Sequence, residues 1–119
     1  MGRGGAGPSR PLPGADVIRR RRFAELVSRQ LDLFEREHAG LVAECEAAER
    51  AYDLAPREEA EERYGDYVDL VETGTELLAD LRDHYASSLP VERAEEYEDV
   101  FNRAVRRRLP RFALEIEET

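Results

Sequence analysis

Lysine and tryptophan are absent from this sequence of 119 residues, which also contains only one cysteine. All 18 basic residues are therefore arginines, a bias that most simply reflects a GC-rich genome. Because Cys45 is alone, no disulfide can form within the chain, and nothing indicates an oxidising compartment. No apolar run approaches the roughly 18 residues that a membrane-spanning helix needs. We therefore expect a cytoplasmic protein that does not enter a membrane.

The familiar signatures of catalysis are missing as well. The sequence has no Ser/His/Asp arrangement, no metal-binding pair of cysteines and no phosphate-binding loop. We interpret Cys45 as a small apolar filler, because the apolar pattern around it contains no neighbouring histidine or arginine that would lower the pKa of its thiol. The sequence therefore predicts a protein that is not an enzyme and holds no cofactor.

Acidic residues outnumber basic ones by 27 to 18, but the excess is unevenly distributed. Residues 1–22 carry six arginines and one aspartate, a net charge of +5. Residues 23–102 carry seven arginines and 23 acids (−16), and residues 103–119 carry five arginines and three glutamates (+2). A central region this acidic repels nucleic acid and anionic membranes, so only the two ends are candidates for binding either.

The balance of 41% hydrophobic and 38% charged residues favours an elongated all-α domain with a narrow apolar seam. Residues 1–15 are rich in glycine, proline and arginine, and are predicted to be a disordered arm. A single helical domain is predicted over residues 16–109, and residues 110–119 form a C-terminal tail too short to assign to a helix or a strand. Capping residues and prolines place the helices at about 16–53, 56–87 and 90–108.

Apolar residues in the first two predicted helices recur at alternating spacings of four and three, the pattern of a coiled coil. Paired antiparallel around a turn at residues 53–57, the two seams predict a helical hairpin, and the third, shorter helix packs on its open end to give a three-helix bundle. The seam positions are Val27, Leu31, Phe34, His38, Leu41, Cys45, Ala48 and Tyr52 in the first helix, and Ala60, Tyr64, Tyr67, Val71, Gly74, Leu78, Leu81 and Tyr85 in the second.

Gly74 stands out because a glycine inside a helix costs about 1 kcal/mol relative to alanine. In the antiparallel pairing, Gly74 faces His38. We therefore hypothesise that Gly74 makes room for the His38 imidazole, which would be buried and hydrogen-bonded by Thr73 or Thr75.

The third predicted helix is too short to reach the turn of the hairpin. At 1.5 Å per residue its 18 or so residues span roughly 27 Å, enough to cover only the half of the hairpin away from the turn. Apolar side chains near the turn should therefore stay partly exposed, and exposed apolar surface marks a protein partner or self-association. The candidate partner-binding residues are Val42, Tyr64, Tyr67 and Val68.

Glu35 and His38 form a Glu-x-x-His pair, the spacing found in di-iron helical bundles. Dimerisation of the hairpin would be needed to complete such a site. The second helix offers no carboxylate in its seam, because Glu72 and Glu76 fall on outward positions. A metal site on this pair is therefore an alternative that the sequence supports less well than a buried structural histidine.

Arginine clusters near both ends are candidate anion-binding sites. One interpretation is a solvated helix face whose cations compensate the helix dipole. The other is an anion-seeking surface that binds nucleic acid or an acidic partner. The candidates are Arg19, Arg20, Arg21, Arg22, Arg106, Arg107, Arg108 and Arg111.

These observations favour a small helical interaction or assembly protein that binds a protein partner, or a second copy as a homodimer, through the hairpin surface. A nucleic-acid-associated regulator that uses the arginine-rich ends is the first alternative. A di-metal four-helix bundle formed by dimerisation is the second.

Overall fold

The computed structural model describes residues 13–119 and confirms the all-α class, because this range contains helices and no strand. Five α-helices and one 3-10 helix are present where three helices were predicted. The elements are α1 (Pro13–Glu37), α2 (Ala39–Leu54), α3 (Arg57–Ala86), α4 (Val91–Arg108), η2 (Pro110–Phe112) and α5 (Ala113–Glu118).

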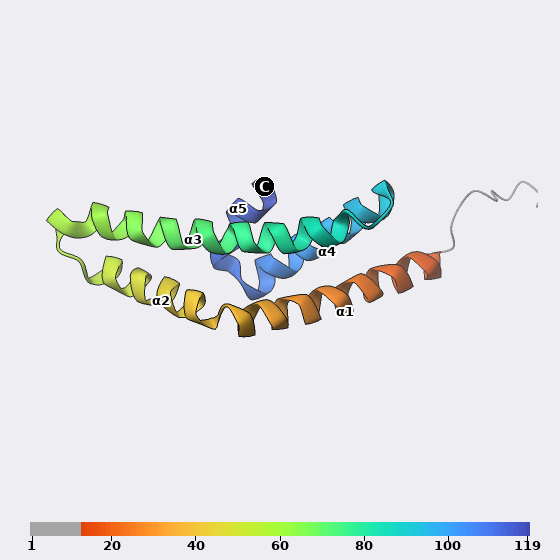
Figure 1. Ribbon diagram of the computed structural model, residues 1–119, viewed down its shortest axis with the longest axis horizontal. Helices are drawn as coiled ribbons and strands as arrows, with labels where there is room; N and C mark the ends of the chain where they lie inside the picture. The colour runs from red at the N-terminus through yellow and green to blue at the C-terminus, as the bar shows by residue number, and fades with distance from the viewer. Residues whose placement is uncertain (1–12) are drawn as a thin grey trace, which may run out of the picture.

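The molecule is elongated, with principal extents of 77 × 26 × 20 Å (Figure 1). Helix α2 lies along the first part of α3, to which it is joined by a short turn. Helix α1 diverges from α3, and α4 fills the space between them, packed against both. The η2 and α5 segments then lie against α3 and α4. The molecule thus has a four-helix body at one end and only two helices at the other.

The first predicted helix, 16–53, is wrong as one continuous element. It begins earlier, at Pro13, and is interrupted at His38, whose backbone angles (φ −118°, ψ 29°) leave the helical region. Backbone hydrogen bonds still flank the break, from His38 N to Phe34 O (2.9 Å) and from Val42 N to His38 O (3.1 Å). The four-three spacing of apolar residues continues across His38, so the sequence pattern does not reveal the interruption of the helix. The bend lets α1 lean onto α4 while α2 stays on α3 (Figure 1).

The predicted N-terminal arm falls mostly outside the described residues. Residues 1–12 are not described, whereas residues 13–15 belong to α1.

The C-terminal residues 110–119 are part of the core rather than a tail. They form η2 and α5, and they bury Phe112, Ala113 and Ile116. Phe112 is 1% exposed, and its ring meets that of Phe34 edge-on, with centroids 6.4 Å apart. The alternation of apolar residues after Pro110 was too short to reveal this helix, which exists because α3 and α4 offer it an apolar surface.

Gly74 has a different neighbour from the one predicted. A Cβ atom placed on Gly74 would lie 2.4 Å from Cε1 of Phe112, so the glycine makes room for the Phe112 ring and not for His38. The hypothesis that Gly74 accommodates the imidazole was therefore wrong. Its premise was correct, since a glycine in the middle of α3 does mark the close approach of another side chain. The pairing failed because α1 leaves α3 at His38 and the C-terminal segment takes its place.

Tyr97 of α4 is the central residue between α1 and α3. It is fully buried, and its ring contacts those of Phe23 on α1 and Tyr85 on α3 at centroid distances of 5.7 and 4.8 Å. Its hydroxyl donates a hydrogen bond to Oε1 of Gln30 at 2.8 Å. Tyr97 thus stands between the two helices that the sequence analysis paired directly. Burial of the phenol raises the pKa of Tyr97 to about 12.

The raised pKa of Tyr97 predicts a loss of stability in alkali. The folded state binds the phenolic proton more tightly than the unfolded chain, so this stabilisation is complete below pH 10 and is lost as the pH rises from 10 to about 12. We expect the urea midpoint of the wild type to fall across this window more steeply than that of Tyr97→Phe. Absorbance of tyrosinate at alkaline pH should also show one late-titrating tyrosine that Tyr97→Phe removes. Parallel pH profiles for the two proteins would contradict the assignment.

Candidate functional site

The two-helix end of the molecule, here called the tip and comprising residues 39–69, has almost no core. Cys45 is its only buried residue. Tyr52, Leu54 and Tyr64 are 40%, 84% and 52% exposed at the turn, and the two tyrosine rings lie together with centroids 5.3 Å apart. Two helices bury only the narrow seam between them, so apolar side chains beside that seam stay in contact with solvent. The tip therefore presents apolar and aromatic side chains to the surroundings.

The four predicted partner-binding residues all lie on this tip, with different degrees of cover. Tyr64 is exposed, whereas Val42, Tyr67 and Val68 are half-buried. Tyr67 is covered by Arg111 of η2, whose guanidinium carbon lies 5.9 Å from the ring centroid and whose Nε donates to the Tyr67 hydroxyl at 3.2 Å. Arg111 Nη2 also donates to Oε1 of Glu49 on α2 at 3.0 Å. The C-terminal segment thus covers the base of the tip.

A cleft of about 550 Å³ opens where the tip meets the end of α4. Val42 and Tyr67 line it, so two of the four predicted partner-binding residues share one concave site, together with the metal candidate Glu35 and the anion-binding candidates Arg108 and Arg111. Its walls carry both charges: carboxylates come from α1 and α2, and guanidinium groups come from α4 and η2. The lining residues are Glu35, Val42, Glu46, Glu49, Tyr67, Arg108, Leu109, Pro110, Arg111 and Phe112.

Cys45 lies inside the tip and is inaccessible. Burial raises the pKa of its thiol, and the positive charge of Arg111 opposes that shift only in part. The thiol therefore stays protonated at neutral pH, which suits a packing role and disfavours nucleophilic chemistry.

Glu35 and His38 are not brought together with further ligands. Oε2 of Glu35 accepts a hydrogen bond from Arg108 Nη2 at 2.7 Å, and the half-buried His38 ring lies against Phe34 with centroids 4.9 Å apart. Within residues 13–119, no three His, Cys, Asp or Glu side chains are grouped to hold a metal ion. The predicted hydroxyl partners of His38 are engaged elsewhere, because Thr73 donates to the Asp69 carbonyl and Thr75 to that of Val71.

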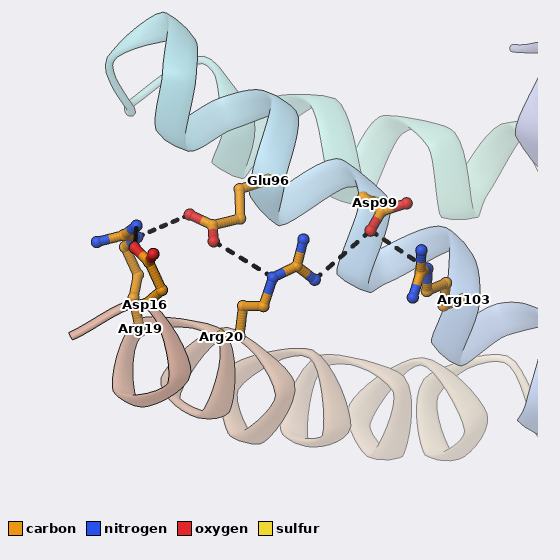
Figure 2. A network of polar contacts seen from close by, with 6 residues as sticks. All are labelled: Asp16, Arg19, Arg20, Glu96, Asp99 and Arg103. Carbon is orange, nitrogen blue, oxygen red and sulfur yellow. Dashed lines mark hydrogen bonds and ion pairs between the residues drawn. The ribbon is translucent and has the colours of Figure 1, made fainter. Parts of the chain in front are cut away.

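The N-terminal arginines partly face α4 rather than solvent. Figure 2 shows Arg19 and Arg20 of α1 pointing at acidic side chains of α4. Arg19 pairs with Glu96 at 2.7 Å as well as with Asp16 at 2.6 Å, and Arg20 lies 3.6 Å from Glu96 and 3.7 Å from Asp99. These ion pairs fasten the start of α1 to α4. The sequence interpretation of a solvated cluster missed them because α4 is remote along the chain.

Most of the C-terminal arginines are likewise engaged. Arg106 pairs with Glu117 at 2.6 Å, and Arg108 bridges Asp32 and Glu35 on α1, both at 2.7 Å. Arg111 pairs with Glu49 as described above. Of the eight candidate arginines, only Arg21, Arg22 and Arg107 make no ion pair with another residue of the described range. Within residues 13–119, five of the eight candidate arginines thus face carboxylates of this chain rather than solvent alone.

Arg82 was not singled out by the sequence, yet it is a buried cation at 4% exposure. Its Nη1 donates to Oδ1 of Asn102 at 3.0 Å and to the Ile116 carbonyl at 2.9 Å, and its Nε donates to Oδ1 of Asp83 at 2.8 Å. It thereby ties α3, α4 and α5 together. A signal was present, because Arg82 follows Leu78 by four residues on the apolar stripe of the helix, where a cation needs buried partners.

Comparisons with protein-family models, curated proteins and solved structures found no match to this chain. The helices and their contacts define the class as an all-α protein with a four-helix body and a two-helix tip. No helix in residues 13–119 combines the length and the apolar character that crossing a membrane requires.

Proposed function

We propose that the protein is a non-enzymatic interaction or assembly module that uses its two-helix tip to bind a protein partner. The observation that carries the proposal is the exposure of Tyr52, Leu54 and Tyr64 at the end of the tip, residues 39–69, where Cys45 is the only buried residue. Aromatic residues at an exposed apolar surface are the usual anchors of protein interfaces. The body also exposes large apolar side chains, but it has a buried core, whereas the tip has a single buried residue and two exposed tyrosine rings in contact. The exposed apolar residues of the body are Val17, Ile18, Leu33, Val91 and Leu114.

The energetics of the tip support this proposal. Fully burying a leucine or phenylalanine side chain contributes about 1.5 to 3 kcal/mol, so covering a few tip residues supplies a substantial part of a binding free energy. The four-three spacing of Leu41, Cys45 and Ala48, together with the contact of Tyr52 with Tyr64, favours an antiparallel coiled-coil arrangement of the tip. A partner helix would add the third layer that this pair lacks.

The nucleic-acid alternative has less support. Five of its eight candidate arginines are occupied in ion pairs within the protein, so binding phosphate would first require breaking them. Residues 23–102, with seven arginines and 23 acids, would repel the phosphate backbone.

Site-specific photocrosslinking in the native cells tests the proposal. A photoreactive phenylalanine analogue placed at Tyr64 should yield a discrete adduct with a protein, or with a second copy of the chain. The same analogue at Asp80, an exposed position on α3 in the body, is the matched control and should yield none. Absence of an adduct at Tyr64, or equal adducts at both positions, would argue against an interface at the tip.

A further inference from the structure

We infer that the partner of the tip is a cationic amphipathic helix, one with an apolar stripe flanked by arginine or lysine. This inference rests on the proposed function and specifies the chemistry of the partner. The surface concerned, here called the docking surface, runs from the cleft to the turn. It consists of Val42, Glu46, Glu49, Tyr52, Tyr64 and Tyr67.

The charge of the tip is the first argument. Residues 39–69 contain ten acids and three arginines, a net charge of −7 on two helices. Three of those acids, Glu49, Glu59 and Asp66, are ion-paired with residues of the described range. The other seven make no ion pair within that range, and Glu46 among them lines the cleft. An apolar surface bordered by uncompensated carboxylates favours a partner that brings cations.

The chain itself provides an example of the ligand chemistry. The C-terminal segment approaches the base of the tip with Arg111, which pairs with Glu49 and lies over the Tyr67 ring, while the adjacent Phe112 fills the space at Gly74. A guanidinium beside an apolar anchor is therefore already accepted by a carboxylate and an aromatic ring of this surface. Nearer the turn, Tyr52 and Tyr64 are 40% and 52% exposed, on a tip that carries ten acids and three arginines. A cationic helix would extend the same pairing toward the turn.

A second copy is a poorer occupant than a cationic helix. Two tips joined face to face would bring together two surfaces that each carry ten acids against three arginines. Like charges across an interface cost several kcal/mol, and the aromatic contacts would have to overcome that repulsion. Self-association through the tip should therefore appear only at salt concentrations that screen the charges.

The test uses the full-length protein and three synthetic helical peptides of about 18 residues, long enough to span roughly 27 Å. The peptides share one leucine stripe and carry arginine, glutamine or glutamate at the flanking positions. Fluorescence anisotropy should show the arginine peptide binding at least about tenfold more tightly than the glutamine peptide, a difference of roughly 1.4 kcal/mol. The glutamate peptide should not bind. Equal affinity for the arginine and glutamine peptides would overturn the inference.

Variants separate docking at the tip from unspecific attraction to an acidic protein. The double substitution Tyr52→Ser and Tyr64→Ser should lower the affinity for the arginine peptide by about tenfold or more, since the apolar anchors are lost. Glu46→Gln should lower the affinity for the arginine peptide and make that affinity less dependent on salt concentration. Asp80→Asn, which removes one negative charge from the body instead, should leave the affinity unchanged. Circular dichroism should show that all variants remain folded. Equal effects of Glu46→Gln and Asp80→Asn, or no effect of the tyrosine variants, would reject the docking surface.

Failure of this inference is distinguishable from failure of the proposed function. If crosslinking at Tyr64 captures a partner, but the crosslinked segment is acidic, uncharged or from a second copy, the tip is an interface and the inferred cationic helix is wrong. If nothing is captured and no peptide binds, the proposed function itself fails. Light scattering at low and high salt identifies the second-copy outcome directly, because a dimer at low salt contradicts the charge argument.

Discussion

Replacing Phe112 by alanine is expected to lower the free energy of unfolding by about 3 to 5 kcal/mol, the range for removing a buried aromatic side chain. The ring is 1% exposed and lies between Gly74 of α3 and Phe34 of α1. Urea denaturation followed by circular dichroism measures the change, and a loss below about 1 kcal/mol would show that the segment is not part of the core.

Gly74→Ala provides the matched test of this contact. We expect the substitution to destabilise the protein when residue 112 is phenylalanine and to stabilise it when residue 112 is alanine. In the wild type, the new Cβ would lie 2.4 Å from the Phe112 ring, so the clash should outweigh the gain in helix propensity and destabilise the protein. In the Phe112→Ala background the clash is gone. There the same substitution should stabilise by about 1 kcal/mol, the propensity difference between the two residues. The same sign in both backgrounds would mean that Gly74 and Phe112 do not face each other.

Arg82→Ala is expected to destabilise the body by about 3 kcal/mol. The substitution removes the donors for the Asn102 side chain and the buried Ile116 carbonyl, and each buried acceptor left without a partner costs about 1 to 3 kcal/mol. It also removes the packed methylene stem of a side chain that is 4% exposed. Hydrogen exchange should show amides of α5 losing protection first, since Arg82 ties that helix to α3.

Arg82→Lys serves as the control for charge. A lysine keeps the cation, but its single ammonium cannot reproduce the fork with which the guanidinium reaches its three partners on three helices. We therefore expect most of the destabilisation of Arg82→Ala to persist. Full stability in Arg82→Lys would show that charge alone is needed at this position.

The exposure of the tip followed only in part from the sequence: Tyr64 is exposed as expected, whereas Tyr67 is half-buried under Arg111, and the exposure of Tyr52 was not predicted. Short-range patterns were enough to predict incomplete cover near the turn. The prolines at 56 and 90 mark helix starts, and a helix of 18 or so residues cannot cover a hairpin of nearly twice its length. The prediction that apolar side chains near the turn lack cover therefore needed only helix lengths and spacing. The cleft was beyond such reasoning, because Arg108 and Arg111 reach it from the other end of the chain.

The sequence by itself determined the helical class, the acidic character of the tip and the starts of α3 and α4 beside Pro56 and Pro90, since periodicity, composition and proline chemistry act locally. Only the tertiary structure decided which helices touch. The break at His38, the insertion of Tyr97 between α1 and α3, and the contact of Phe112 with Gly74 each depend on residues far apart in the chain. Apolar periodicity identifies the buried face of a helix, but not the residue that covers it. Which residue covers that face is decided by the packing arrangement with the fewest voids and the fewest unpaired polar groups.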